Sequence, residues 1–102
     1  MPTLEEVLDY LGIDYADEVV RSNVAHALHA AIAMVKGSVG EDVLKYLPEN
    51  PKVKELVFLY TADLYDERNT STLKTNAVNR RIVDSMELQL KLELRRKKEN
   101  LL

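Results

Sequence analysis

Residues 50–69, NPKVKELVFLYTADLYDERN, constrain the fold most, because a start signal, an apolar core and a stop signal fall within one helix length. Asn50 can accept a hydrogen bond from the free amides of a first turn, and Pro51 suits the first helical position, where no N–H is needed. At about 100° per residue, one face is apolar. That face comprises Val53, Leu56, Val57, Tyr60 and Leu64. Phe58, Leu59 and Tyr65 lie outside it, so the pattern predicts a central helix packed on several sides.

The length and composition favour one small helical domain. The chain has 102 residues, of which 46% are hydrophobic and 30% charged, as in ordinary soluble domains. Glycine and proline are few, three of each, and strong helix formers are abundant. We therefore expect an all-α fold, a small bundle of about four to five helices with a long central helix and a C-terminal helical arm. Residues 1–78 would form the core domain, with a flexible loop near 68–78, and residues 79–102 would form the arm of the same domain.

Two capping patterns predict short helices on either side of a longer one. Thr3 and Glu6 have the T-x-x-E spacing of a capping box, in which each side chain satisfies a backbone amide of the other residue. Ser38 and Glu41 have the same spacing. They predict a short helix over residues 42–47, ended by the proline that follows.

A longer helix should lie between these two. Gly12 can take the left-handed conformation that ends the first helix, and Asp14 or Asp17 can cap the next one. Lys36 followed by Gly37 predicts its end. Its core face would comprise Val20, Val24, Ala27, Leu28, Ala31 and Val35. Alanines also lie on the opposite face, where they allow close approach of another element or simply favour the helix.

The last segment carries two apolar stripes. Residues 88–94, LQLKLEL, alternate with period two like a strand, but Leu, Gln, Lys and Glu are strong helix formers, so we expect a helix. On that helix one stripe comprises Ile82, Val83, Met86, Leu90 and Leu94. Leu88 and Leu92 lie roughly opposite. Because a small domain covers only one such face, the second stripe, with Arg95, Arg96, Lys97 and Lys98 after it, predicts a protein interface.

No pattern in the sequence predicts catalysis. His26 and His29 have a spacing that could share a metal, but the chain has no cysteine and no matching third ligand, so we interpret them as surface or interface residues. The carboxylate pairs are adjacent in sequence and point in different directions. No phosphate-binding glycine loop or nucleophile motif is present. We expect no enzyme, no cofactor and no metal.

Charge is segregated along the chain. Residues 1–67 carry 13 acidic and 5 basic side chains, for −8, and residues 68–102 carry 4 and 9, for +5. The basic end could hold phosphates, dock on an acidic protein, or only complement the dipole of its helix. A small helical regulator that binds nucleic acid through this helix is an alternative function, disfavoured by the acidic body and the lack of a helix-turn-helix pattern. No signal peptide or membrane-spanning run is seen, so we expect a cytoplasmic pool and no membrane partner.

Three segments together resemble a known family. They are TLEEVLDYLGID at residues 3–14, the central KELVFLY followed by LYDERN at 64–69, and MELQLKLELR at 86–95. In this order they are similar to the small head-tail connector (adaptor) proteins of tailed bacteriophages and bacterial prophages. The resemblance implies a structural virion protein that forms a ring, of twelve copies, under the portal protein. DNA passes through the ring without sequence-specific binding, and a stopper or tail-completion protein docks on it.

The same resemblance implies a role for the C-terminal arm. In this family the arm engages the portal, so Leu88, Leu92 and residues 95–98 become candidate docking residues. The protein would be found at the head-tail interface of the virion, and in the host cytoplasm before assembly. We expect the isolated chain to be largely monomeric with a mobile C-terminal segment, because a weak contact becomes effective only when many copies are held together.

Overall fold

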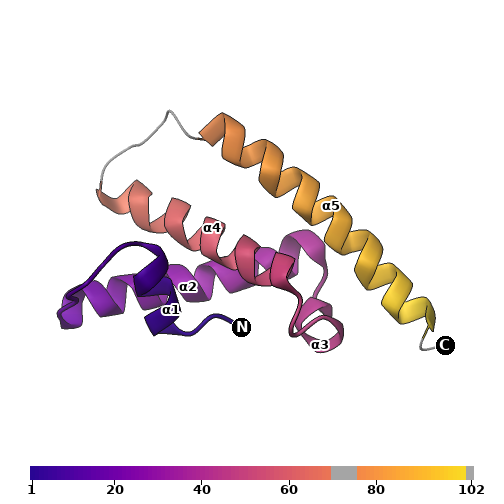
Figure 1. The fold of residues 1–102 in the computed structure, drawn as a ribbon, viewed down its shortest axis with the longest axis horizontal. Coiled ribbons are helices and arrows are strands. Elements are labelled where there is room, and N and C mark those ends of the chain that lie inside the picture. The colour runs from indigo at the N-terminus through magenta and orange to yellow at the C-terminus, as the bar shows by residue number, and fades with distance from the viewer. Residues whose placement is uncertain (70–75, 101–102) are drawn as a thin grey trace.

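The computed structural model describes residues 1–69 and 76–100, with side chains for 1–65 and 80–100. The described residues form five α-helices and no strand, which confirms the all-α prediction (Figure 1). The helices are α1 (Leu4–Tyr10), α2 (Glu18–Val39), α3 (Val43–Tyr46), α4 (Pro51–Asn69) and α5 (Asn76–Asn100). None of them is long and apolar enough to cross a membrane.

Helix α4 lies at the centre of the bundle, as predicted. Asn50 Oδ1 accepts a hydrogen bond from the Lys52 amide at 2.9 Å, so the cap read from the sequence is present. The helix contacts α1, α2 and α5, and its contact with α2 is the most extensive in the molecule. Val53, Leu56 and Val57 are fully buried. Phe58 and Leu59, outside the main apolar face, still pack against the core because neighbours lie on several sides.

The core joins α4 to the inner faces of α2 and α5. Helix α2 contributes five of its six predicted core residues as buried side chains, and the sixth, Val20, packs at the margin. Thr61 is the buried polar residue of this core, and its hydroxyl donates to the Val57 carbonyl at 2.6 Å. This bond within the helix satisfies the buried hydroxyl, so Thr61 can lie in the core without an unpaired polar group.

The first helix begins with the predicted capping box. Thr3 Oγ1 accepts from the Glu6 amide, and the Glu6 carboxylate accepts from the Thr3 amide. Gly12 follows with a φ of 75°, the left-handed conformation expected of it. The Tyr10 ring stacks on the Phe58 ring at 4.7 Å between centroids, which holds α1 against α4.

The predicted end of α2 is wrong. The helix continues through Gly37 and Ser38 to Val39 and ends at Gly40, whose φ is 151°. Ser38 donates its hydroxyl to the Val35 carbonyl and caps nothing, so the second capping box does not form. Asp17 caps the start of α2, at 2.9 Å from the Val20 amide. A glycine inside a helix costs only about 1 kcal/mol, and the burial of Val35 and Val39 outweighs it.

Helix α5 confirms the helical prediction for the last segment and corrects two details. It begins at Asn76 and not at residue 79, while α4 continues to Asn69. The middle of the predicted flexible loop, residues 70–75, lies outside the described residues. Ile82, predicted to be in the core, has 47% of its surface exposed, because the centre of the buried face runs through Val83, Leu90 and Leu94.

Candidate docking surface

The C-terminal half of α5 is held to the bundle by buried leucines. It extends past the start of α4 and lies against α3 (Figure 1). Leu90 is fully buried and Leu94 nearly so. The Leu94 side chain reaches the backbone at Gly40, between α2 and α3. This half of the helix is therefore part of the core.

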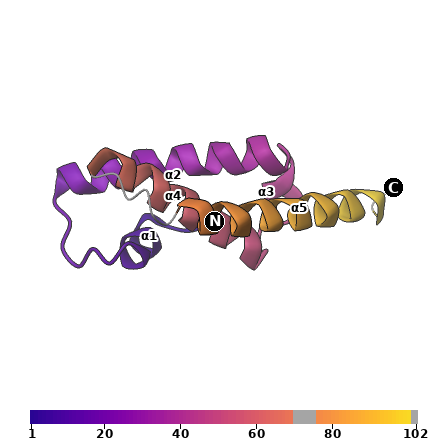
Figure 2. The same ribbon diagram turned by 90° about the horizontal axis from the view of Figure 1, so that it is seen from above.

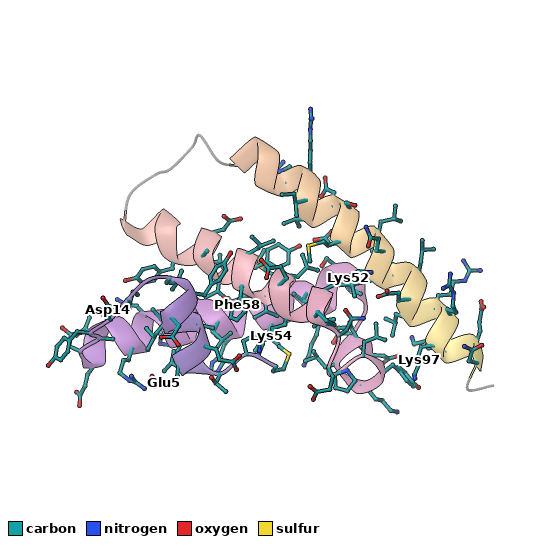
Figure 3. All side chains as sticks on the ribbon, in the orientation of Figure 1. Glu5, Asp14, Lys52, Lys54, Phe58 and Lys97 are labelled. Carbon is teal, nitrogen blue, oxygen red and sulfur yellow. The ribbon has the colours of Figure 1, made fainter. Side chains whose placement is uncertain are left out.

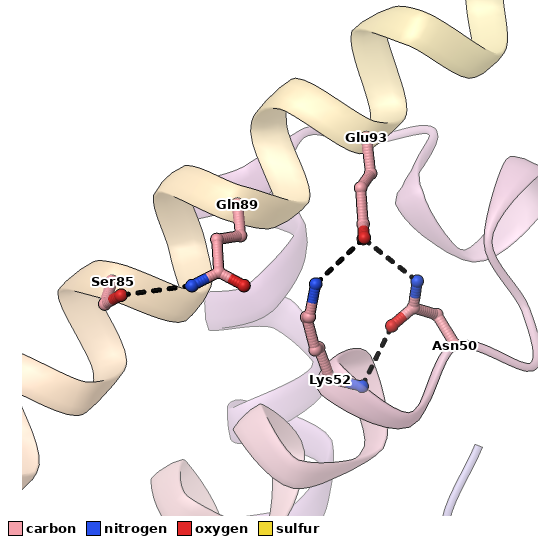
Figure 4. A network of polar contacts seen from close by, with 5 residues as sticks. All are labelled: Asn50, Lys52, Ser85, Gln89 and Glu93. Carbon is pink, nitrogen blue, oxygen red and sulfur yellow. Dashed lines mark hydrogen bonds and ion pairs between the residues drawn. The ribbon is translucent and has the colours of Figure 1, made fainter.

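Polar contacts tie the same half to the start of α4. Glu93 accepts from Lys52 Nζ at 2.9 Å and from Asn50 Nδ2 at 3.1 Å (Figure 4). Asn50 also caps α4, so a single side chain joins two helices. The hydrogen bond from Lys52, assisted by that from Asn50, holds the pKa of Glu93 below its ordinary value of 4.5. A further bond, from the Tyr60 hydroxyl to Glu87, joins α4 to α5 six residues before Glu93.

The opposite side of α5 is uncovered. We call it the α5 outward face; its members are all exposed and comprise Arg81, Ser85, Leu88, Leu92, Arg95, Arg96 and Glu99. Leu88 and Leu92 are 59% and 52% exposed and are neighbours at i, i+4 on this face. The sequence placed them away from the core, and the structure agrees. More than half of each side chain is therefore open to solvent.

The four cations predicted to act together are separated by the structure. Arg95 and Arg96 lie on the α5 outward face, and Arg95 contacts Glu99 at 3.3 Å. Lys98 turns inward, where Nζ lies 2.7 Å from Asp42 Oδ2 and 5.9 Å from the centre of the Tyr46 ring. Lys98 lowers the pKa of Asp42 by hydrogen bonding to its carboxylate. Lys98 thus binds residues of its own chain, while Lys97 is exposed.

A second uncovered surface lies on α2. We call it the α2 outward face; it comprises Glu18, Ser22, His26, His29, Ala30, Ala33, Lys36 and Gly37, all exposed except the half-buried Lys36. No Asp, Glu, Lys or Arg occurs from residue 22 to residue 35. An exposed helical face normally carries charges. The alanines of this face left two readings open, close approach of another element or simple helix preference; the run without charge is the sequence signal that favours the first.

The described side chains offer no arrangement suited to a metal. His26 and His29 are exposed on α2, as interpreted from the sequence. Among residues 1–65 and 80–100, no three His, Cys, Asp or Glu side chains are close enough to hold an ion together. Glu6 and Lys54 border an open depression of about 250 Å³ and are paired with each other. The Lys54 hydrogen bond lowers the pKa of Glu6.

Comparison with models of protein families, with curated proteins and with solved structures finds no match. What is known of this chain's function therefore comes from the two outward faces and from the resemblance of its three sequence segments.

Proposed function

We propose that this protein is a structural subunit of the head-tail connector of a tailed bacteriophage or prophage. Copies would form a ring, of twelve subunits by the family resemblance, beneath the portal protein. DNA would pass through the ring, and a stopper or tail-completion protein would dock on it. The observation that carries this proposal is the α5 outward face, with Leu88 and Leu92 more than half exposed.

An exposed leucine pair supports a protein partner. Single exposed leucines are common, but Leu88 and Leu92 adjoin one another on a helix whose other side is already buried in the core. Because only about half of each side chain is still exposed, burying the rest would release about 0.8–1.5 kcal/mol each. That energy is small for one contact, which suits a subunit that is monomeric alone and assembles when a portal ring holds many copies together.

The distribution of charge supports a channel through which DNA moves. The first 20 residues hold six acidic side chains and no Lys or Arg. Figure 3 places Asp14 near one end of the molecule and Lys97 near the other. An acidic wall repels phosphate, so DNA would slide past it without sticking. The protein would need no cofactor and carry out no reaction.

Electron microscopy with a portal ring tests the proposal. The purified chain is mixed with the portal of a tailed phage whose genome encodes it, and the products are imaged. A ring of copies beneath the portal is expected. The double variant Leu88→Ser, Leu92→Ser should fail to add this ring, whereas Ser85→Ala on the same face should add it. Failure of the unaltered protein to bind would overturn the proposal.

A second candidate is a nucleic-acid-binding regulator that uses the exposed cations of α5. Arg96 and Lys97 are exposed and form no ion pair with another described residue. Binding through phosphates alone would weaken steeply as salt rises. A DNA-binding titration at several salt concentrations separates the candidates. Sequence-specific binding at moderate salt would favour the regulator, and weak binding that salt abolishes would favour the connector.

A further inference from the structure

We propose that the α2 outward face of one copy receives the α5 outward face of the next copy, with the two helices parallel. The ring itself rests on the proposed function; the new step is which two helices meet between neighbouring subunits. It assigns Leu88 and Leu92 to the neighbouring subunit. It leaves Lys97, which is exposed outside this face near the end of the arm, for the portal.

The two faces lie on different sides of one molecule. Helix α5 forms the upper edge of the molecule in Figure 1, and α2 forms an edge in the perpendicular view of Figure 2. Each helix buries its inner side in the common core. The two faces therefore cannot meet within one chain. Between copies they form a heterologous contact, the kind that generates a ring when its rotation closes.

The α2 outward face offers small side chains where the α5 outward face offers large ones. Ala30 and Ala33 leave α2 a shallow surface beside His26 and His29, and no Asp, Glu, Lys or Arg stands on it between residues 22 and 35. Leu88 and Leu92 project from α5 with about half of their surface exposed. Large side chains of one helix pack into the spaces between small side chains of another. An uncharged surface is also the one that costs least to cover with leucine.

Charges at the ends of the faces determine the direction of pairing. Glu18 and Lys36 are 18 residues apart on α2, and Arg81 and Glu99 are 18 residues apart on α5. This separation is about five helical turns, or about 27 Å, so each pair lies on one side of its helix. In a parallel pair, Glu18 meets Arg81 and Lys36 meets Glu99. An antiparallel pair in the same register would bring Glu18 to Glu99 and Lys36 to Arg81, and like charges repel.

These end groups are available for pairing. Glu18, Lys36 and Arg81 make no ion pair with another described side chain, and Glu99 makes only the 3.3 Å contact to Arg95. In the parallel register Leu92 lies opposite His29, and Ser85 lies opposite Ser22.

An antiparallel pair of α5 helices from two copies would also match Arg81 with Glu99. It would leave the uncharged face of α2 bare and could not extend into a ring.

Three single-cysteine variants distinguish these arrangements, because the chain has no cysteine of its own. Ser22→Cys, Ser85→Cys and Arg95→Cys are mixed in pairs at about millimolar concentration, where weak contacts form, and oxidised. The proposal expects disulfides between Ser22→Cys and Ser85→Cys. Dominant linkage of Ser22→Cys to Arg95→Cys would show antiparallel α2 and α5. Linkage of Ser85→Cys to Arg95→Cys would show paired α5 helices. Either result, or no linkage, would overturn the proposal.

Charge reversal and chain growth complete the test. Glu18→Arg should slow the Ser22→Cys to Ser85→Cys linkage by about threefold, and Arg81→Glu on the other chain should restore it. Lack of restoration would contradict the register. One chain bearing both cysteines should give a ladder of oligomers, whereas a product that stops at dimer would contradict a head-to-tail contact. The cross-linking uses no portal, so its failure is distinct from a failure of the portal to bind.

Discussion

Gly40 lies so close to Leu94 that a Cβ on the glycine would be 2.8 Å from the leucine Cδ2 atom. Gly40 also has a φ of 151°, which other residues rarely adopt. We expect Gly40→Ala to lower the free energy of unfolding by about 1–3 kcal/mol, through backbone strain and displacement of Leu94. Urea unfolding followed by circular dichroism measures this change. Unaltered stability would mean that α5 does not pack on the end of α2.

Gly37→Ala is the matched control for that variant. Gly37 lies inside α2, and a Cβ there would meet nothing within 4 Å. The substitution should therefore raise the free energy of unfolding by about 0.5–1 kcal/mol, because alanine favours the helix and restricts the unfolded chain. The same urea unfolding curve tests this. Loss of stability would indicate that α2 ends at Lys36, as the sequence suggested.

Truncation of Leu90 should destabilise the protein far more than truncation of Leu88 or Leu92. Leu90→Ala removes a fully buried side chain and should cost about 2–5 kcal/mol of unfolding free energy. Leu88→Ser and Leu92→Ser alter side chains that are more than half exposed, and each should cost only about 0.5–1.5 kcal/mol. Chemical unfolding compares the three. A large loss from either serine variant would place its leucine in the core and remove it from the docking surface.

The Glu93 contact predicts a dependence of stability on pH. Because the folded-state pKa of Glu93 is below its ordinary 4.5, the contact stabilises the protein above that value and is lost as the pH falls through the folded pKa. Glu93→Gln should remove about 0.5–1 kcal/mol at pH 7 and almost nothing at pH 2. Unfolding of both proteins across this range tests the difference. A constant difference between them would contradict the ion pair with Lys52.

Lys98 and Lys97 should differ although they are adjacent. Lys98→Met removes the ion pair with Asp42, so the pKa of Asp42 should rise toward its ordinary 3.8 and the last turn of α5 should exchange its amide protons faster. Lys97→Met should do neither. NMR titration and hydrogen exchange measure both effects. Identical behaviour of the two variants would show that Lys98 does not hold the end of the arm.

The sequence by itself determined the local structure where the signals lie within one helix. Asn50, the Thr3 and Glu6 capping box and Gly12 act on backbone groups a few residues away, so their spacing predicted them. The same spacing at Ser38 and Glu41 did not form a box, because α2 continues through Ser38. Periodicity identified the buried faces of α2 and α4. It also separated Leu88 and Leu92 from Leu90 and Leu94, because angle around a helix depends only on residue number.

Tertiary structure decided what depends on neighbours distant in sequence. Gly37 remained helical because Val35 and Val39 pack into the core around it, and Lys98 turned away from its neighbours toward Asp42. Ile82 is exposed because it lies on α5 away from the buried face that runs through Val83, Leu90 and Leu94. Only the folded chain shows that the outward faces of α2 and α5 are both bare, since exposure depends on where other helices lie and not on local pattern.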